Sequence, residues 1–170
     1  MQRRNFGALV GATLAAAAWP ETAAAQQSST TLFTITRSKN KNAVVYRAKT
    51  HGPELDQHQP LEAYWLMLAE DGRREELGWA ERKLAYGFGV SGLSRERCVL
   101  SLVAFKQRPV TVERRDKTLR AFTSIAGQPG TLERIFVQTS EGTLLPSVQY
   151  LDVFGVGLDG RPLRERISAR

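Results

Sequence analysis

The sequence holds few of the side chains on which nucleophilic, metal and disulfide chemistry depend. It has one cysteine, Cys98, and two histidines among 170 residues. A single thiol excludes a disulfide within the chain, so packing must stabilise the fold. The thiol lies in "RCVLSLVAF", where apolar residues alternate. This pattern predicts a buried, inert cysteine rather than a nucleophile.

Signature motifs of common enzyme classes are also absent from the sequence. "GVSGLS", around Ser91, lacks the Gly-x-Ser-x-Gly spacing of serine hydrolases. "GFGVSG" leads into a predicted strand and not into a helix, so it lacks the helix N-terminus of a phosphate-binding loop. The carboxylates of "EDGRREE" flank a pair of arginines at a turn, which is typical of exposed, mutually neutralised charge. We therefore assign no catalytic residue and no cofactor, and the question of an activity stays open.

The first 25 residues have the layout of a secretory signal. Arg3 and Arg4 precede an apolar run from Phe6 to Trp19, and the small residues Ala23 to Ala25 follow. The run is shorter than the ~20 residues of a spanning helix. We predict a cleavable signal over 1–25, a periplasmic or secreted protein, and no membrane anchor after cleavage. The arginine pair points to the twin-arginine route, and ordinary secretion is the alternative.

The rest of the chain reads as a disordered lead, 26–31, and a single β domain, 32–170. Ala80, Leu84 and Phe88 recur at a spacing of four, which predicts one short helix at about 79–87. We expect about eight mostly antiparallel strands, arranged as a barrel or a sandwich. The helix would cover the strand around Cys98, which is apolar on both faces. The predicted strands are 32–37, 43–50, 61–69, 97–105, 109–115, 119–126, 131–140 and 147–157.

Both histidines lie in "HGPELDQH", between two predicted strands. A metal site needs its ligands to converge from several directions, which only a curled loop would allow here. The alternative, a solvated surface loop, is what this polar composition favours. We therefore assign no metal. The residues that could serve as ligands are His51, Glu54, Asp56 and His58.

The chain carries a net charge of +7, and its densest basic cluster surrounds one predicted hairpin. In an exported protein this charge points to lipid head groups or acidic glycans rather than to nucleic acid. A solvated hairpin is the alternative. The residues of the cluster are Arg114, Arg115, Lys117 and Arg120.

Several segments resemble a bacterial exported family catalogued as domain of unknown function 4833. They are "TITRSKNKNAVVYRA", "PLEAYWLMLAEDGRREEL", "ERKLAYGFGV" and "PSVQYLDVFGVGLDGRPLRERI". The resemblance implies an exported, stand-alone domain and no particular activity. It also directs attention to seven positions as candidate ligand-binding residues. These are Arg37, Asn40, Tyr46, Tyr64, Trp65, Tyr86 and Gly87.

Three functions remain after these observations. The first is a non-catalytic module of the cell envelope, which binds a small ligand in an aromatic pocket or an anionic envelope component. The second is a hydrolase that acts on envelope material with a carboxylate and a histidine. The third is a structural subunit of an envelope complex. The lack of an assembled catalytic motif favours the first.

Overall fold

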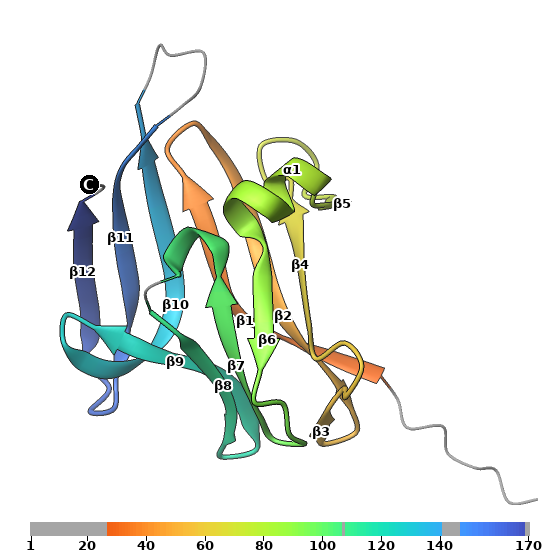
Figure 1. The fold of residues 1–170 in the computed structure, drawn as a ribbon. Helices are drawn as coiled ribbons and strands as arrows, with labels where there is room; N and C mark the ends of the chain where they lie inside the picture. The colour runs from red at the N-terminus through yellow and green to blue at the C-terminus, as the bar shows by residue number, and fades with distance from the viewer. Residues whose placement is uncertain (1–26, 107, 141–146, 169–170) are drawn as a thin grey trace, which may run out of the picture.

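The computed structural model of the chain describes residues 27–106, 108–140 and 147–168 (Figure 1). The expected signal, 1–25, lies outside this part, so the signal and the export route stay predictions. Gln27 to Thr31 fall in the segment expected to be disordered, but they continue the first strand and pair with its neighbour. Within the described part, no helix is both long and apolar enough to cross a bilayer.

The fold is mainly β, as predicted, and its strands form one curled sheet that makes half a barrel (Figure 1). The β1–β10 pair is parallel and the other pairs described are antiparallel. The strands are β1 (Gln27–Arg37), β2 (Asn40–His51), β3 (Glu54–Leu55), β4 (Leu61–Leu66), β5 (Arg74–Glu76), β6 (Phe88–Ser91), β7 (Arg97–Leu102), β8 (Val110–Arg115), β9 (Thr118–Ile125), β10 (Gln128–Thr139), β11 (Val148–Gly157) and β12 (Pro162–Ser168).

The described residues form twelve strands rather than about eight. The additional ones are β3, β5, β6 and β12. β3 and β5 have two and three residues, too few for an alternating pattern to show. β6 is interrupted by a glycine, which made it resemble a flexible loop.

The sheet branches at β10. Its first residues, Gln128 to Thr131, pair with β9, and Arg134 to Val137 pair with β1. β11 pairs along nearly the whole of β10, so β9 and β1 must share the other edge and diverge from it. At this bend a Cβ on Gly155 would lie 2.1 Å from the Thr131 carbonyl oxygen. Only glycine allows β10 and β11 to approach this closely.

Buried side chains fill the inside of the curled sheet. Phe33 stacks on Tyr46, with 4.5 Å between ring centroids, and both are almost completely buried. Ile135 and Val153 extend this core across β10 and β11. Cys98 is fully buried, as predicted, and its burial raises the pKa of the thiol to about 11.

The expected helix consists of an α-helical turn, α1 (Trp79–Glu81), and a π-helical turn, η1 (Arg82–Tyr86). We name these residues the helical segment. It packs at the end of the sheet against a 3₁₀ turn, η2 (Val103–Phe105), where the Val103 amide donates to the Gly87 carbonyl at 2.9 Å. The expectation that the Cys98 strand is buried on both faces is wrong. β7 ends at Leu102, and Ser101 on its outer face is exposed.

Candidate binding site

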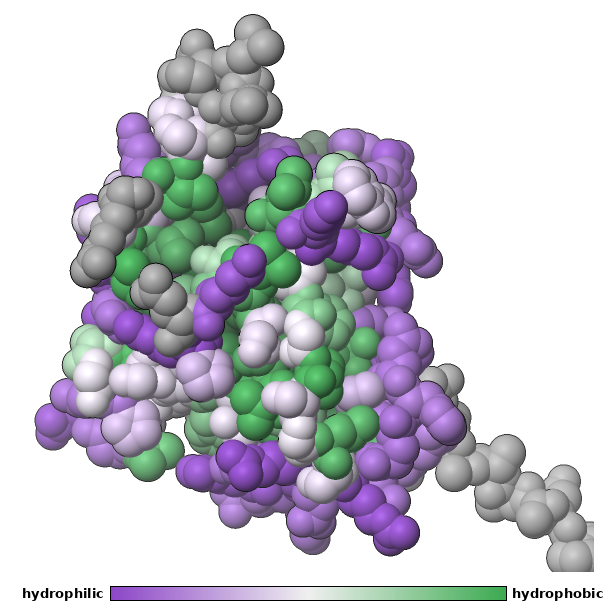
Figure 2. Space-filling model, viewed as in Figure 1, coloured by the Kyte–Doolittle hydropathy of each residue, from purple (hydrophilic) through white to green (hydrophobic). Residues whose placement is uncertain are grey.

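A pocket of about 630 Å³ lies between the two ends of the strand order. The order begins with β5 and β4 and ends with β6, and residues of all three strands line this one pocket. We name it the seam pocket. Its size falls within the ~300–1,000 Å³ usual for ligand sites. Figure 2 shows hydrophobic side chains gathered in the middle of the face on which β6 and β7 lie in front, between hydrophilic margins.

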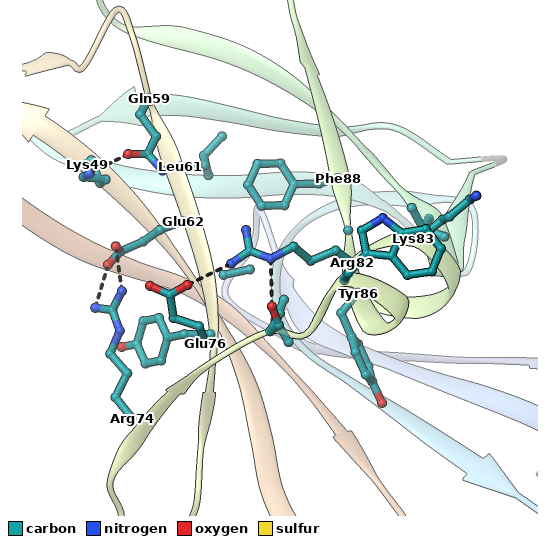
Figure 3. Close-up of a pocket in the computed structure, with 16 residues that line it drawn as sticks. Lys49, Gln59, Leu61, Glu62, Arg74, Glu76, Arg82, Lys83, Tyr86 and Phe88 are labelled. Atoms are coloured by element: carbon teal, nitrogen blue, oxygen red, sulfur yellow. Dashed lines mark hydrogen bonds and ion pairs between the residues drawn. The ribbon is translucent and has the colours of Figure 1, made fainter.

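The seam pocket has an apolar floor and a charged rim (Figure 3). Leu61 and Leu77 are almost completely buried, and Phe88 is half-buried beside them. The basic side chains of the rim outnumber its carboxylates, so the local charge is positive. The charged residues are Lys49, Arg74, Arg82, Lys83, Glu62 and Glu76.

Two of the four cations are held by carboxylates. Arg74 bonds Glu62 at 3.0 Å and stacks on the Tyr64 ring, with its guanidinium carbon 3.9 Å from the centroid. Arg82 reaches toward Glu76, 3.5 Å away, and donates through Nε to the Leu77 carbonyl at 2.9 Å (Figure 3). These contacts fix the direction of both guanidinium groups.

The two lysines are placed differently. Lys49 Nζ donates to Gln59 Oε1 at 2.9 Å, and Lys83 Nζ lies 4.9 Å from the centre of the Trp79 ring. Within the described part of the chain, neither lysine forms an ion pair with a carboxylate. Both charges therefore remain available to an anionic ligand.

Glu81 fixes the helical segment beside the pocket. One carboxylate oxygen accepts from Trp65 Nε1 at 2.9 Å, and the other accepts from the Gly78 amide at 2.8 Å. The segment nevertheless leaves Trp79 and Leu84 each 74% exposed. The spacing of four that predicted the helix does not place Leu84 in the core, because a π turn bonds i to i+5 and rotates the side chains.

Four of the seven residues suggested by the family resemblance form one aromatic cluster behind the pocket. The Tyr46 hydroxyl donates to the Tyr86 carbonyl at 2.7 Å. Tyr86 meets Trp65 edge to face at 5.1 Å, and the Arg37 guanidinium lies 4.9 Å from the Trp65 ring centre. Burial raises the pKa of the Tyr46 and Tyr86 phenols, and Arg37 partly opposes this for Tyr86. These contacts join the sheet to the helical segment.

The other three suggested residues lie apart from this cluster. Tyr64 lies beneath Arg74 at the edge of the seam pocket. Gly87 also lines the pocket, and a Cβ there would lie only 1.9 Å from the Arg82 carbonyl oxygen. Asn40 is the first residue of β2, directly after the β1–β2 turn, and its side chain accepts from the Asn42 amide at 3.2 Å. The structure thus brings Tyr64, Tyr86 and Gly87 to the pocket and leaves Asn40 away from it.

The side chains of the histidine loop have separate partners. Asp56 is buried and accepts from the amides of His58 and Gln59 at 2.8 and 2.9 Å. These amides, more than His51 at 3.3 Å, lower the pKa of Asp56. Glu54 turns to Arg95, 3.3 Å away. Across the described ranges, no three His, Cys, Asp or Glu side chains converge as a metal site would require.

The basic hairpin is divided between two surfaces. Arg114 donates to the Lys117 carbonyl at 2.8 Å and to the Pro53 carbonyl, so it ties the hairpin to the loop after β2. Arg115 instead bonds Glu113 at 2.6 Å and, with Arg120, lines a second pocket. The cluster is therefore not one continuous basic surface.

Sequence reasoning did not identify the charged rim of the seam pocket. Lys49 comes from β2, Glu62 from β4, and Arg82 from the helical segment, so their convergence depends on the tertiary fold. One local signal was present. Trp79 and Lys83 stand four residues apart, the spacing at which neighbouring side chains of a helix meet.

One family model, "Domain of unknown function (DUF4833)", matches residues 33–166. The match covers most of the chain and confirms the resemblance seen in the sequence motifs. No curated protein and no solved structure was found to match.

Proposed function

The chain belongs to the DUF4833 family, a domain of unknown function, and we propose from the seam pocket that it is a non-catalytic module that binds an anionic ligand of the cell envelope. One observation carries the proposal: an excess of cations surrounds an apolar floor beside an exposed tryptophan. The class of ligand follows from these features.

The charge of the rim selects for an anion. Four basic and two acidic side chains line the pocket, and both carboxylates already have an arginine partner. Lys49 and Lys83 can each give a charge-assisted hydrogen bond to a carboxylate or phosphate, which is stronger than a neutral one. A neutral or cationic ligand would leave this charge uncompensated.

The apolar surfaces select for a ligand with a flat face. Trp79, 74% exposed, stands at the pocket, and Phe88 contributes to its floor. Aromatic side chains contribute large contact areas and bind other flat surfaces, including sugar rings, through their faces. Together with the lysines, they fit an acidic sugar.

The site is also held in place before a ligand arrives. The ion pairs orient Arg74 and Arg82, and Glu81 anchors the helical segment through two hydrogen bonds. Fixing side chains in advance lowers the entropic cost of binding. The π turn is a further sign of function, since such turns often occur at functional sites.

The place in the cell envelope is part of the same proposal. It is supported by the arginines, apolar run and small residues of 1–25, which have the pattern of an export signal. The net charge of +7 fits an anionic envelope component.

A hydrolase that uses a carboxylate and a histidine is less well supported. Glu62 and Glu76 are each engaged by an arginine, and neither histidine lines the seam pocket. A general acid or base needs to reach the proton that it transfers. Here the carboxylates orient cations instead.

Tryptophan fluorescence tests the proposal directly. The probe is N-acetylmuramic acid, which joins a sugar ring to a carboxylate, and the matched control is N-acetylglucosamine, which lacks that carboxylate. We expect saturable quenching with the acid only, lost in Trp79→Phe and weakened about tenfold in Lys83→Ala. Arg95→Ala, an exposed arginine outside the pocket, should bind normally.

Two results would count against an anionic ligand. Equal quenching by both sugars would show that the carboxylate is not recognised, and no quenching by either would remove acidic sugars from consideration. Native mass spectrometry of the gently purified protein adds an independent check. A bound protein subunit there would favour the structural role, which the exposed Trp79 and Leu84 would then serve.

A further inference from the structure

A second pocket lies beside the point on β10 where pairing with β9 ends and pairing with β1 has not yet begun. Pairing of β9 with β10 runs as far as Phe122↔Thr131, and pairing of β1 with β10 starts only at Thr34↔Arg134. A pocket of about 640 Å³ fills the space between them. We name it the wedge pocket; its lining comes from β1, the β8–β9 hairpin, β10 and the β11–β12 turn.

Divergence of strands creates a binding site because it leaves backbone groups without partners. Within the described ranges, no strand pairs with the β10-facing edge of β1 at Thr30 and Thr31. Donors and acceptors of the main chain are therefore free to bind a ligand there.

Two β-bulges flank the wedge pocket. The β1–β2 register shifts between Thr31 and Phe33, and the β10–β11 register shifts between Leu132 and Arg134. Bulges redirect side chains and are frequent beside functional sites. They also break the regular spacing of backbone groups that an added peptide strand would need, so an extended peptide is a poor occupant.

The lining is rich in hydroxyl groups and balanced in charge. The lining includes two arginines, Arg115 and Arg120, and two carboxylates, Asp116 and Glu133, so its net charge is near zero, in contrast with the seam pocket. The Arg115 guanidinium lies 4.2 Å from the centre of the Phe122 ring. The hydroxyl groups belong to Thr30, Thr31, Thr118 and Thr131.

We propose that the wedge pocket binds a neutral saccharide. Sugar hydroxyls both donate and accept hydrogen bonds, which matches threonine hydroxyls, an arginine donor and a carboxylate acceptor. Arg120, Glu133 and Thr118, which all line the pocket, would supply the donor, the acceptor and the hydroxyl. This site is independent of the seam pocket, and its ligand differs in charge.

Saturation-transfer NMR on the full chain tests this proposal with N,N′-diacetylchitobiose and cellobiose. We expect transfer to at least one disaccharide. Its dissociation constant should rise at least about tenfold in Glu133→Gln, because the hydrogen bond to a charged acceptor is lost. Thr118→Val, at an exposed position, gives a second variant if Glu133→Gln folds poorly. Arg95→Ala is the matched control and should bind normally.

Outcomes at the two pockets can be told apart. Among the residues that the structure describes, no tryptophan lines the wedge pocket, so saccharide binding there should leave Trp79 fluorescence unchanged. A dissociation constant that is unchanged in both wedge variants would overturn the proposal, as would no transfer to either disaccharide. Neither result would bear on the anionic ligand of the seam pocket.

Discussion

Replacing Tyr46 by phenylalanine removes one of the hydrogen bonds that join the sheet to the helical segment. The Tyr46 hydroxyl is fully buried and donates to the Tyr86 carbonyl at 2.7 Å. The variant keeps the ring stack on Phe33. Its loss of stability therefore comes mainly from the missing hydrogen bond and from the Tyr86 carbonyl, which stays buried without a partner. Such losses cost about 1–3 kcal/mol. For a chain of this size the melting temperature should fall by about 2–4 °C per kcal/mol.

Urea unfolding followed by circular dichroism measures this loss. The midpoint should fall with an unchanged m-value, because the exposed area on unfolding is the same. Tyr64→Phe is the matched control. Its hydroxyl lies 3.5 Å from Arg47 Nη1, the limit of a hydrogen bond, so its removal should change stability by less than about 0.5 kcal/mol. Equal effects of the two variants would refute a special role for the Tyr46 bond.

Three further predictions concern backbone and charge. Gly87→Ala should lower the free energy of unfolding in urea by at least about 1–3 kcal/mol, because the added Cβ would collide with the Arg82 carbonyl oxygen. Ala126→Asn should stabilise by about 0.5–1 kcal/mol in the same assay, because φ is 52° at this position and asparagine tolerates the left-handed region. The hydrogen bond from Arg108 lowers the pKa of Glu165 in the folded protein. The pair therefore contributes its full stabilisation above the pKa of the carboxylate in the unfolded chain, about 4, and this contribution is lost as pH falls through the pKa in the folded protein. Unfolding midpoints at pH 6 and pH 3 should therefore differ less in Glu165→Gln.

Alternation along the sequence identified the long strands because one face of each is buried. β9 shows this plainly, with Leu119, Ala121 and Ile125 inside and Thr118 and Arg120 outside. Reasoning from periodicity failed where contacts between distant parts of the chain, and not the local spacing of apolar residues, decide the backbone conformation. The π turn is one example: its bonding depends on the close approach of Gly87 to Arg82, which side-chain periodicity does not encode.

For the candidate site, the sequence motifs identified mainly the buried residues behind the pocket rather than the charged side chains that would contact a ligand. Tyr46, Trp65 and Tyr86 are brought together, but as the buried cluster behind the pocket. The charged rim went unnoticed, because Lys49 and Lys83 are separated in sequence and each looks like any surface lysine. Charge clustering along the chain instead favoured the β8–β9 hairpin, whose arginines the fold turns to different sides.

Both pockets arise where backbone pairing stops. The seam pocket lies between the terminal strands of the order, and the wedge pocket lies where β10 exchanges β9 for β1. Strand pairing fixes where the two pockets lie, and the helical segment and the β11–β12 turn complete their walls. Under the two proposals, the side chains around each pocket select its ligand: uncompensated lysines at the seam would favour an anion, and balanced charge with hydroxyls at the wedge would favour a neutral sugar. Substitutions at the rims should therefore alter which ligand binds while leaving the fold intact.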